Sequence, residues 1–145
     1  MSVPLNTTHP CHGTCVALNG RAALIIGKSG SGKSTLGLQL LAYGAGLIAD
    51  DRTALACIDG RIIASAPDNI AGLIEARGMG VLNAAVHPPA TVACVIDLDC
   101  ISQERIPAPK SITISGVEIP MFARSAMGDF AASVMQFLRA GMSDK

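Results

Sequence analysis

The chain has 145 residues, enough for one domain with a sizeable core, and 50% of them are hydrophobic although aromatic residues make up only 3%. Eleven basic and eleven acidic residues give a formal net charge of zero, so bulk charge gives no reason to propose a nucleic acid as a partner. The amino-terminal stretch MSVPLNTTHPCHGT has neither the basic nor the apolar region of a signal peptide. The longest apolar runs are too short to cross a bilayer, and a cytoplasmic location is expected.

Five cysteines occur in the chain. Their odd number and the lack of a signal peptide argue against a disulfide framework. The stretch CHGTC, with Cys11 and Cys15, could form half of a metal site, but no second pair of ligands follows at the spacing of a structural zinc site. Most of the cysteines are therefore interpreted as small, buried, apolar side chains.

A hairpin and a helix are predicted near the start of the chain. Residues 14–18 and 22–26 are short apolar runs separated by Asn19-Gly20, which is a strong signal for a hairpin. A helix is predicted over residues 34–43, because leucines give it a wide apolar face and Gly44 is a favourable residue just past its end.

The next segment predicts more β-structure. A strand is expected at residues 47–49, and residues 53–58 and 61–65 have the pattern of a second hairpin across Asp59-Gly60. Residues 67–77 are predicted to be a loop, with room for a short helical turn.

The second half contains a buried strand at residues 91–98 and a proline-containing loop at 101–110. Residues 111–119 are predicted to be β-like, and residues 124–139 are predicted to be a helix with an apolar stripe. Strands come first, with one early and one late helix. This order predicts a single α/β domain, residues 1–145, built around a mixed sheet.

The sequence GKSGSGKS, residues 27–34, matches the phosphate-loop pattern G-x-x-x-x-G-K-[ST] completely. An apolar strand precedes it and a helix follows it, as the motif requires. Glycines let the backbone curl so that amide groups converge on an anion at the start of the helix. The lysine supplies a charge to the β- and γ-phosphates, and the last serine supplies a hydroxyl to Mg²⁺. The predicted nucleotide-binding residues are Gly27, Lys28, Ser29, Gly30, Ser31, Gly32, Lys33, Ser34 and Thr35.

Adjacent carboxylates, Asp50 and Asp51, end the strand that follows the first helix. Side chains alternate along a strand, so the two acids should point to opposite sides unless the strand ends between them. We expect Asp51 to face the transferred phosphoryl group and Asp50 to support the metal. Asp97 and Asp99 also end the predicted strand at 91–98. One of them could be a Walker-B-type acid, but a strand-terminal cap or turn is the more common interpretation.

Three motifs in order, GKSGSGKS, IADDR and EARGMG, resemble the HPr kinase/phosphorylase family in its C-terminal catalytic domain. The resemblance runs from His12 to about Pro107 and is to the short alphaproteobacterial form without the N-terminal domain. It implies an α/β fold with a P-loop on a mixed β-sheet, of the type shared by HPr kinase and PEP carboxykinase.

The resemblance also implies roles for individual residues. Asp51 matches the residue that acts as base in the kinase reaction, and Asp50 is its neighbour in the same motif. The implied catalytic residues are Asp51, Asp50, His12, Lys33 and Arg105, and the implied magnesium ligands are Ser34, Glu75 and Asp50. Taken alone, a single histidine or an arginine near a glutamate is more often a surface residue or a solvated ion pair.

The implied function is phosphorylation of a serine on the phosphocarrier protein HPr, with ATP and Mg²⁺, by a homo-oligomer that the family forms as a hexamer. The family also reverses the reaction by phosphorolysis. The long form carries PVRPGRN near its C-terminus, and only Pro120 and Arg124 correspond to it here, so phosphorylase activity is the less firmly implied direction. A small-molecule kinase and a non-catalytic nucleotide sensor are the alternatives.

Overall fold

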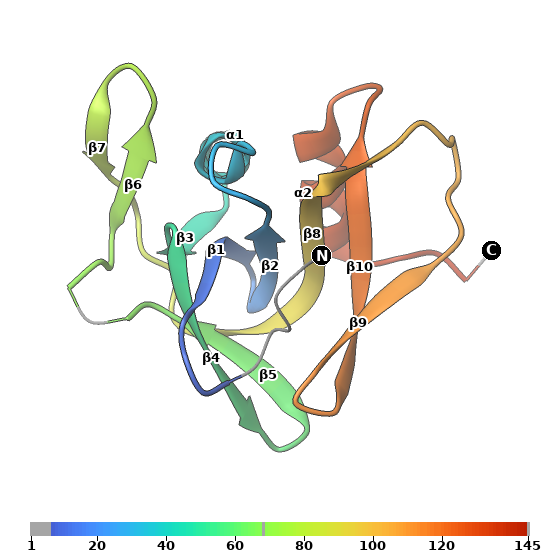
Figure 1. The fold of residues 1–145 in the computed structure, drawn as a ribbon, viewed down its shortest axis with the longest axis horizontal. Coiled ribbons are helices and arrows are strands. Elements are labelled where there is room, and N and C mark those ends of the chain that lie inside the picture. The colour runs from blue at the N-terminus through green and yellow to red at the C-terminus, as the bar shows by residue number, and fades with distance from the viewer. Residues whose placement is uncertain (1–6, 68, 145) are drawn as a thin grey trace.

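The structure is a computed structural model that describes residues 7–67 and 69–144. A large mixed sheet carries two helices and a separate two-stranded hairpin (Figure 1). The helices are α1 (Lys33–Ala42) and α2 (Phe130–Ala140). The strands are β1 (Cys11–Leu18), β2 (Arg21–Ile26), β3 (Gly46–Ala49), β4 (Arg52–Ile58), β5 (Arg61–Ser65), β6 (Leu73–Ala76), β7 (Gly80–Asn83), β8 (Ala90–Ser102), β9 (Lys110–Ile114) and β10 (Val117–Ser125).

The main sheet has the order β2-β1-β4-β5-β8-β10-β9, with β3 beside β1. Strand β2 also pairs with β8, so five strands close into a ring. The β2–β8 and β8–β10 pairs are parallel, and the other pairs in this sheet are antiparallel. The predicted α/β domain with a mixed sheet is therefore confirmed. The strand that precedes the phosphate loop, β2, lies between β1 and β8.

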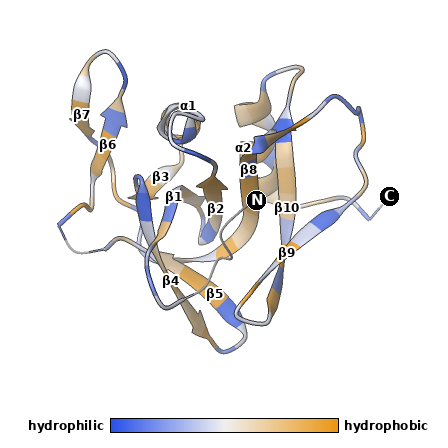
Figure 2. Cartoon of the chain, viewed as in Figure 1, coloured by the Kyte–Doolittle hydropathy of each residue, from blue (hydrophilic) through white to orange (hydrophobic). Residues whose placement is uncertain are grey.

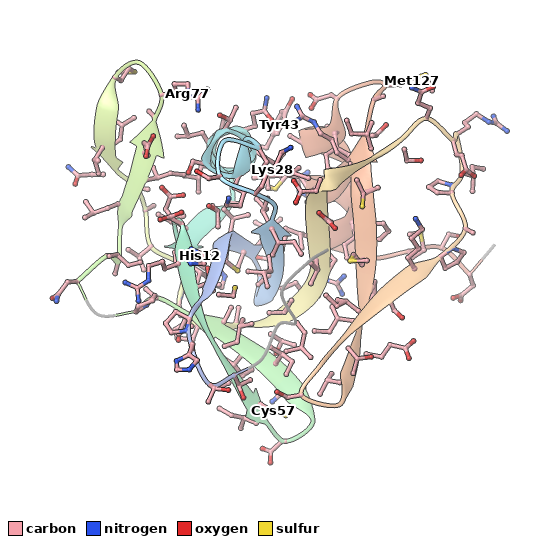
Figure 3. The ribbon with its side chains drawn as sticks, in the orientation of Figure 1. His12, Lys28, Tyr43, Cys57, Arg77 and Met127 are labelled. Carbon is pink, nitrogen blue, oxygen red and sulfur yellow. The ribbon has the colours of Figure 1, made fainter. Side chains whose placement is uncertain are left out.

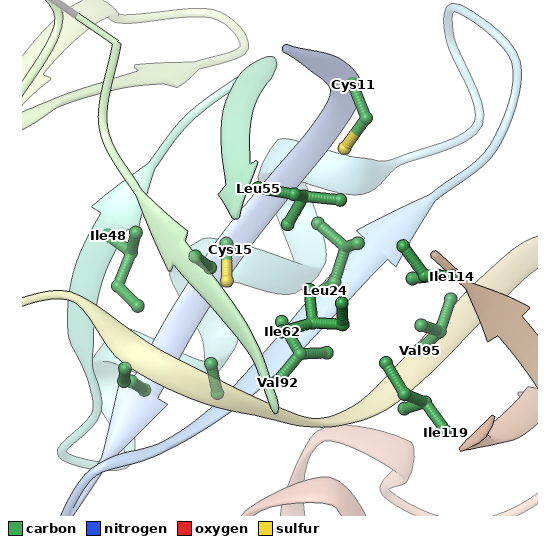
Figure 4. Close-up of a cluster of buried hydrophobic side chains, with 14 of the residues drawn as sticks. Cys11, Cys15, Leu24, Ile48, Leu55, Ile62, Val92, Val95, Ile114 and Ile119 are labelled. Atoms are coloured by element: carbon green, nitrogen blue, oxygen red, sulfur yellow. The ribbon is translucent and has the colours of Figure 1, made fainter. Parts of the chain in front are cut away.

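Alternating side chains on β2 divide the core into two parts. Leu24 and Ile26 point into the interior of the strand ring, where they pack with β1, β4, β5 and β8 (Figure 4). Ala23 and Ile25 point the other way, toward the two helices. Figure 2 shows the corresponding concentration of hydrophobic residues along the strands of the central sheet. Because both faces are covered, the strand is held in place up to the point where the phosphate loop begins.

The two helices contact each other as well as the sheet. Leu36 and Leu40 of α1 are buried, as are Val134 and Leu138 of α2. Tyr43, at the end of α1, donates a hydrogen bond from its hydroxyl to Asp129, which also accepts the amide of Ala132 at the start of α2. This hydrogen bond raises the pKa of Tyr43 and lowers that of Asp129. The end of α1 is thereby tied to the start of α2.

The predicted loop at residues 67–77 is wrong in its second half, which forms strand β6 and pairs with β7. Ile74 and Ala76 are buried, and the glycines at 78 and 80 have φ values of 90° and 131° that allow the chain to reverse between the strands. From the sequence alone, this glycine-rich stretch predicts a loop. In the structure α1 packs on β6 and covers its apolar face, which stabilises the strand. Residue 68 of this predicted loop lies outside the described residues.

Three boundaries in the second half also differ from prediction. Strand β8 continues to Ser102 and β9 begins at Lys110, which shortens the predicted 101–110 loop. The region 111–119 contains a turn at Ser115-Gly116 and so belongs to two strands. The helix predicted from 124 begins at Phe130, because Arg124 is still paired with β8 and Asp129 caps the helix. Its C-terminal boundary is one residue later than predicted.

Three of the five cysteines, Cys11, Cys15 and Cys94, are buried, whereas Cys57 and Cys100 are exposed. Burial raises the pKa of Cys11 to about 11 and that of Cys94 to about 12. The interpretation of most cysteines as small core residues is therefore confirmed. No helix in the described part of the chain is long and apolar enough to cross a membrane.

Candidate active site

The phosphate loop connects β2 to α1 and has the backbone geometry expected of its glycines. Gly27, Gly30 and Gly32 have φ values of 154°, 81° and 100°. A Cβ on Gly27 would lie 2.5 Å from the Ser31 hydroxyl oxygen, so a larger residue there would force the loop to shift. Gly32 is the N-cap of α1 and no side chain caps the helix. The first amides of α1 are therefore available to an anion, and the helix dipole favours negative charge at the same place.

Lys33 holds the two ends of the loop together. Its ammonium group donates to the carbonyl oxygens of Gly27 and Lys28, at 2.9 and 3.2 Å. The amide of Lys28 donates to both carboxylate oxygens of Asp99, each at 3.1 Å. Asp99 in turn donates its amide to Asp97. Both acids lie inside β8, which continues to Ser102, so the expectation that they end the strand as a cap or turn is wrong. The loop is fixed from the β8 side through Asp99.

Asp50 is the centre of a compact polar cluster beside the loop. Its Oδ1 accepts hydrogen bonds from Ser34 Oγ at 2.6 Å and from Thr14 Oγ1 at 2.8 Å. Its Oδ2 accepts the backbone amide of Glu75 at 2.8 Å. One carboxylate therefore joins the phosphate loop, β1 and β6.

Asp51 is positioned by its backbone and not by its side chain. Its amide donates to Thr14 Oγ1 at 3.2 Å, and its carbonyl accepts the amide of Gly13 at 3.0 Å. Its φ is 66°, so the chain turns at this residue. Its side chain is exposed, and within residues 7–67 and 69–144 the carboxylate makes no hydrogen bond. Strand β3 ends before both acids, so strand alternation does not fix their directions.

The remaining predicted site residues, His12, Glu75 and Arg105, differ in how they connect to the Asp50 cluster. His12 lies opposite Arg52 in the β1–β4 pair, next to Gly13, and it is exposed (Figure 3). Glu75 reaches Asp50 through its amide, while its side chain is exposed. Arg105 is exposed in the loop between β8 and β9, and no described contact joins it to Asp50 or to the phosphate loop. Its catalytic role stays a prediction.

The donor set beside the loop fits a magnesium ion. A serine hydroxyl and a carboxylate lie 2.6 Å apart, and both are oxygen ligands of the kind that Mg²⁺ prefers. The described residues contain no cluster of three or more His, Cys, Asp or Glu side chains that could form a metal cage by themselves. Sites that bind a nucleotide-bound Mg²⁺ need fewer, because phosphates and water supply the remaining ligands.

Three residues near the loop were not among the predicted site residues. Thr14 is fully buried and links Asp50 to Asp51, and its sequence signal is a polar residue at the start of the apolar run 14–18. Asp99 anchors the loop, as described above. Arg124 lies with its guanidinium Nη1 3.9 Å from the position that a Cβ on Gly32 would occupy. The sequence signal for Arg124 is its partial correspondence to PVRPGRN, but that correspondence does not place it beside the loop, because β8 lies between β10 and β2 in the sheet.

Replacing Thr14 with valine is expected to destabilise the protein by about 1–3 kcal/mol, because valine keeps the shape but leaves buried polar groups without partners. It should also lower phosphoryl transfer by disordering the two acids. Urea unfolding and a kinase assay measure the two effects. Thr53→Val is the matched control: Thr53 is also fully buried, but it donates to the carbonyl of Gly13. Equal kinase losses in the two variants would contradict the role of Thr14.

A phosphate loop at the end of a central strand, an uncapped helix and a serine-bound aspartate define a P-loop nucleotide-binding domain. A family model for the HPr serine kinase C-terminal domain matches residues 4–105. The chain belongs to this family.

Curated relatives agree with this assignment, and a solved structure shares the fold. The chain is 38% identical over 114 residues to the HPr kinase/phosphorylase of Geobacillus thermodenitrificans, covering 70% of this chain and 35% of that protein. It is 39% identical over 74 residues to the protein of the same name from Malacoplasma penetrans, covering 51% and 25%. The structure of the Hpr(Ser) kinase/phosphatase from Coxiella burnetii superposes with a TM-score of 0.75 at 22% identity and covers 91% of this chain and 95% of that one. The chain spans about a third or less of these two relatives' length, and the structural match supports the fold.

Proposed function

We propose that this domain transfers the γ-phosphoryl group of ATP to a serine hydroxyl of the phosphocarrier protein HPr. The observation that carries the proposal is the contact between the phosphate loop and the IADDR motif, where Ser34 Oγ donates to Asp50 at 2.6 Å. This contact supports a site in which the phosphate loop after β2 and the acidic motif after β3 lie side by side. The names of the relatives, HPr kinase/phosphorylase, support HPr as the acceptor.

The reaction places little covalent work on the protein, and positioning and charge stabilisation dominate. The loop amides and the ammonium group of Lys33 would bind the β- and γ-phosphates. Ser34 and Asp50 would hold Mg²⁺, with Glu75 nearby. When bound, Mg²⁺ supplies positive charge to the phosphate oxygens. The free carboxylate of Asp51 would accept the proton of the attacking serine, with His12 at the adjacent position on β1.

The reverse reaction would use the same groups. Inorganic phosphate would attack the phosphorus of phosphoserine, the bond from phosphorus to the serine oxygen would break, and pyrophosphate would leave. Asp51 would return a proton to the serine oxygen. The loop that holds the β- and γ-phosphates in the forward direction suits pyrophosphate equally well, since the two share the same phosphate groups.

We also propose that the protein acts in the cytoplasm as a homo-oligomer, with a hexamer as the form implied by the resemblance. A small-molecule kinase and a nucleotide sensor remain the alternative functions. A small-molecule kinase would phosphorylate a metabolite instead of HPr. A nucleotide sensor would bind ATP without transferring its phosphoryl group.

The test uses purified HPr and mass spectrometry. With ATP and Mg²⁺, HPr should gain one phosphoryl group on a serine; with phospho-HPr and phosphate, the group should be lost and pyrophosphate should form. Unmodified HPr together with tight ATP binding would refute the kinase proposal and favour the sensor.

A further inference from the structure

Helix α1 has a glycine in its interior that the backbone conformation does not require. Gly37 is buried near the middle of the helix, and its φ is not positive. Glycine is one of the least favourable residues inside a helix, because it loses the most backbone freedom on folding. Its presence at this position therefore indicates that a neighbouring group needs the space that a side chain would fill.

Two side chains of the sheet and the hairpin approach Gly37. Helix α1 packs on β1 and on β6 (Figure 1). A Cβ on Gly37 would lie 3.0 Å from Cγ2 of Thr14, on β1, and 3.4 Å from Cδ1 of Ile74, on β6. The second distance is at the limit of ordinary contact, and Cδ1 is the free end of its side chain. The first distance is too short for ordinary contact, so the Thr14 methyl group would have to move.

Thr14 connects this contact to the two acids. Its methyl group and its hydroxyl are attached to the same Cβ, and a β-branched side chain has few favourable χ1 values. The hydroxyl donates to Asp50 Oδ1 at 2.8 Å and accepts the amide of Asp51 at 3.2 Å. A rotation that carries the methyl group away from position 37 therefore carries the hydroxyl away from these partners. Because Thr14 is fully buried, no water is at hand to replace it.

The phosphate loop joins the same cluster from the same face of the helix. Ser34 precedes Gly37 by three residues, so the two lie on one side of α1. Ser34 Oγ donates to Asp50 Oδ1 at 2.6 Å, which is the oxygen that also accepts the Thr14 hydroxyl. The position of Asp50 therefore depends on how closely α1 approaches β1.

We propose that Gly37 is a positioning residue for phosphoryl transfer. Its lack of a side chain lets the Thr14 methyl group lie against α1, so that the Thr14 hydroxyl holds Asp50 and Asp51 beside the phosphate loop. The effect on catalysis rests on the proposed function, which makes Asp51 the base and Asp50 a ligand of Mg²⁺. The effect on the geometry of the two acids does not depend on that function.

The test measures the effect of Gly37→Ala in three backgrounds. In the parent, the added Cβ should lower the rate of HPr labelling at saturating ATP by about tenfold, less than the roughly 10²-fold that a 1 Å misplacement can cost. Thr14→Ser keeps the hydroxyl and removes the methyl group, so in this background the same alanine should lower the rate by less than about twofold. Ile74→Val is the matched control, because it removes only the other neighbour, Cδ1. In that background the loss should stay about tenfold.

A second readout does not need enzyme activity. The amide of Asp51 donates to Thr14 Oγ1, so its hydrogen-exchange rate, measured by NMR without ligand, reports the position of that hydroxyl. Gly37→Ala should speed this exchange in the parent and leave it unchanged in the Thr14→Ser background. The amide of Ala132, which donates to Asp129 at the start of α2, should exchange at the parent rate throughout, which shows that the fold is retained.

Two results would overturn the inference: an equal loss of HPr labelling on adding Gly37→Ala in all three backgrounds, or unchanged exchange at Asp51 when Gly37→Ala is made in the parent. If the parent does not label HPr and the Asp51 amide still responds as expected, the proposed function fails while the role of Gly37 in placing the acids stands.

Discussion

Replacing Asp51 with asparagine is expected to lower the rate of phosphoryl transfer to HPr by about 10²–10⁴-fold, which is the usual contribution of a general base. Asparagine keeps the size of the side chain but cannot accept the serine proton. The backbone should be unaffected, because Asp51 has a φ of 66° and asparagine tolerates this conformation well. The measurement is the initial rate of HPr labelling at saturating ATP.

The control for this variant is Asp59→Asn. Asp59 is also exposed and has a φ of 53°, but it lies in the turn between β4 and β5, away from the loop. We expect the control to label HPr at the parent rate. We also expect Asp51→Asn to bind ADP as tightly as the parent, because in the described residues the Asp51 carboxylate makes no hydrogen bond to the phosphate loop. Labelling by Asp51→Asn at the parent rate would show that another group is the base.

The phosphate loop could be predicted from the sequence because everything it needs is local. Strand β2, the glycines and α1 follow one another without interruption, and each local preference agrees with the final structure. The pairing of the loop with Asp50 needed one more step, the return of the chain through β3. Only α1 and β3 separate the loop from Asp50, so the order of the motifs was enough to predict that the two lie close together.

The contacts on the β8 side could not be predicted in this way. Lys28 and Asp99 are 71 positions apart, and they meet because β2 and β8 pair in parallel. Arg124 comes close to Gly32 of the phosphate loop only because β10 pairs with β8 up to its last residues. The prediction of a helix from residue 124 would have removed this arginine from the sheet.

The hairpin β6–β7 could not be predicted from the sequence for a different reason. Its sequence motif, EARGMG, was recognised as part of the site, although its strand was not. The alternation of exposed and buried residues in β6 covers only four positions, which is too short to outweigh the glycines that follow. The hairpin positions the amide of Glu75 against Asp50, so the motif contributes to the cluster through its backbone.

Replacing Lys33 with methionine is expected to lower phosphoryl transfer by about 10²–10³-fold, the range seen when one preorganised charged or polar donor is removed from a transition state. Unlike Asp51→Asn, this variant should also weaken ADP and pyrophosphate binding, because the ammonium group attracts the phosphates before and during transfer. Methionine is close to lysine in length and apolar volume, and Lys33 is 9% exposed, so the fold should be retained.

Labelling rates and calorimetry with both ligands measure these effects. Arg61→Met is the control, since it also removes one positive charge but at the exposed start of β5. Parent-like affinity for pyrophosphate in Lys33→Met would mean that the lysine serves the loop only by holding the carbonyls of Gly27 and Lys28. Loss of binding in Lys33→Met, together with intact binding in Asp51→Asn, would separate the group that holds the phosphates from the group that moves the proton.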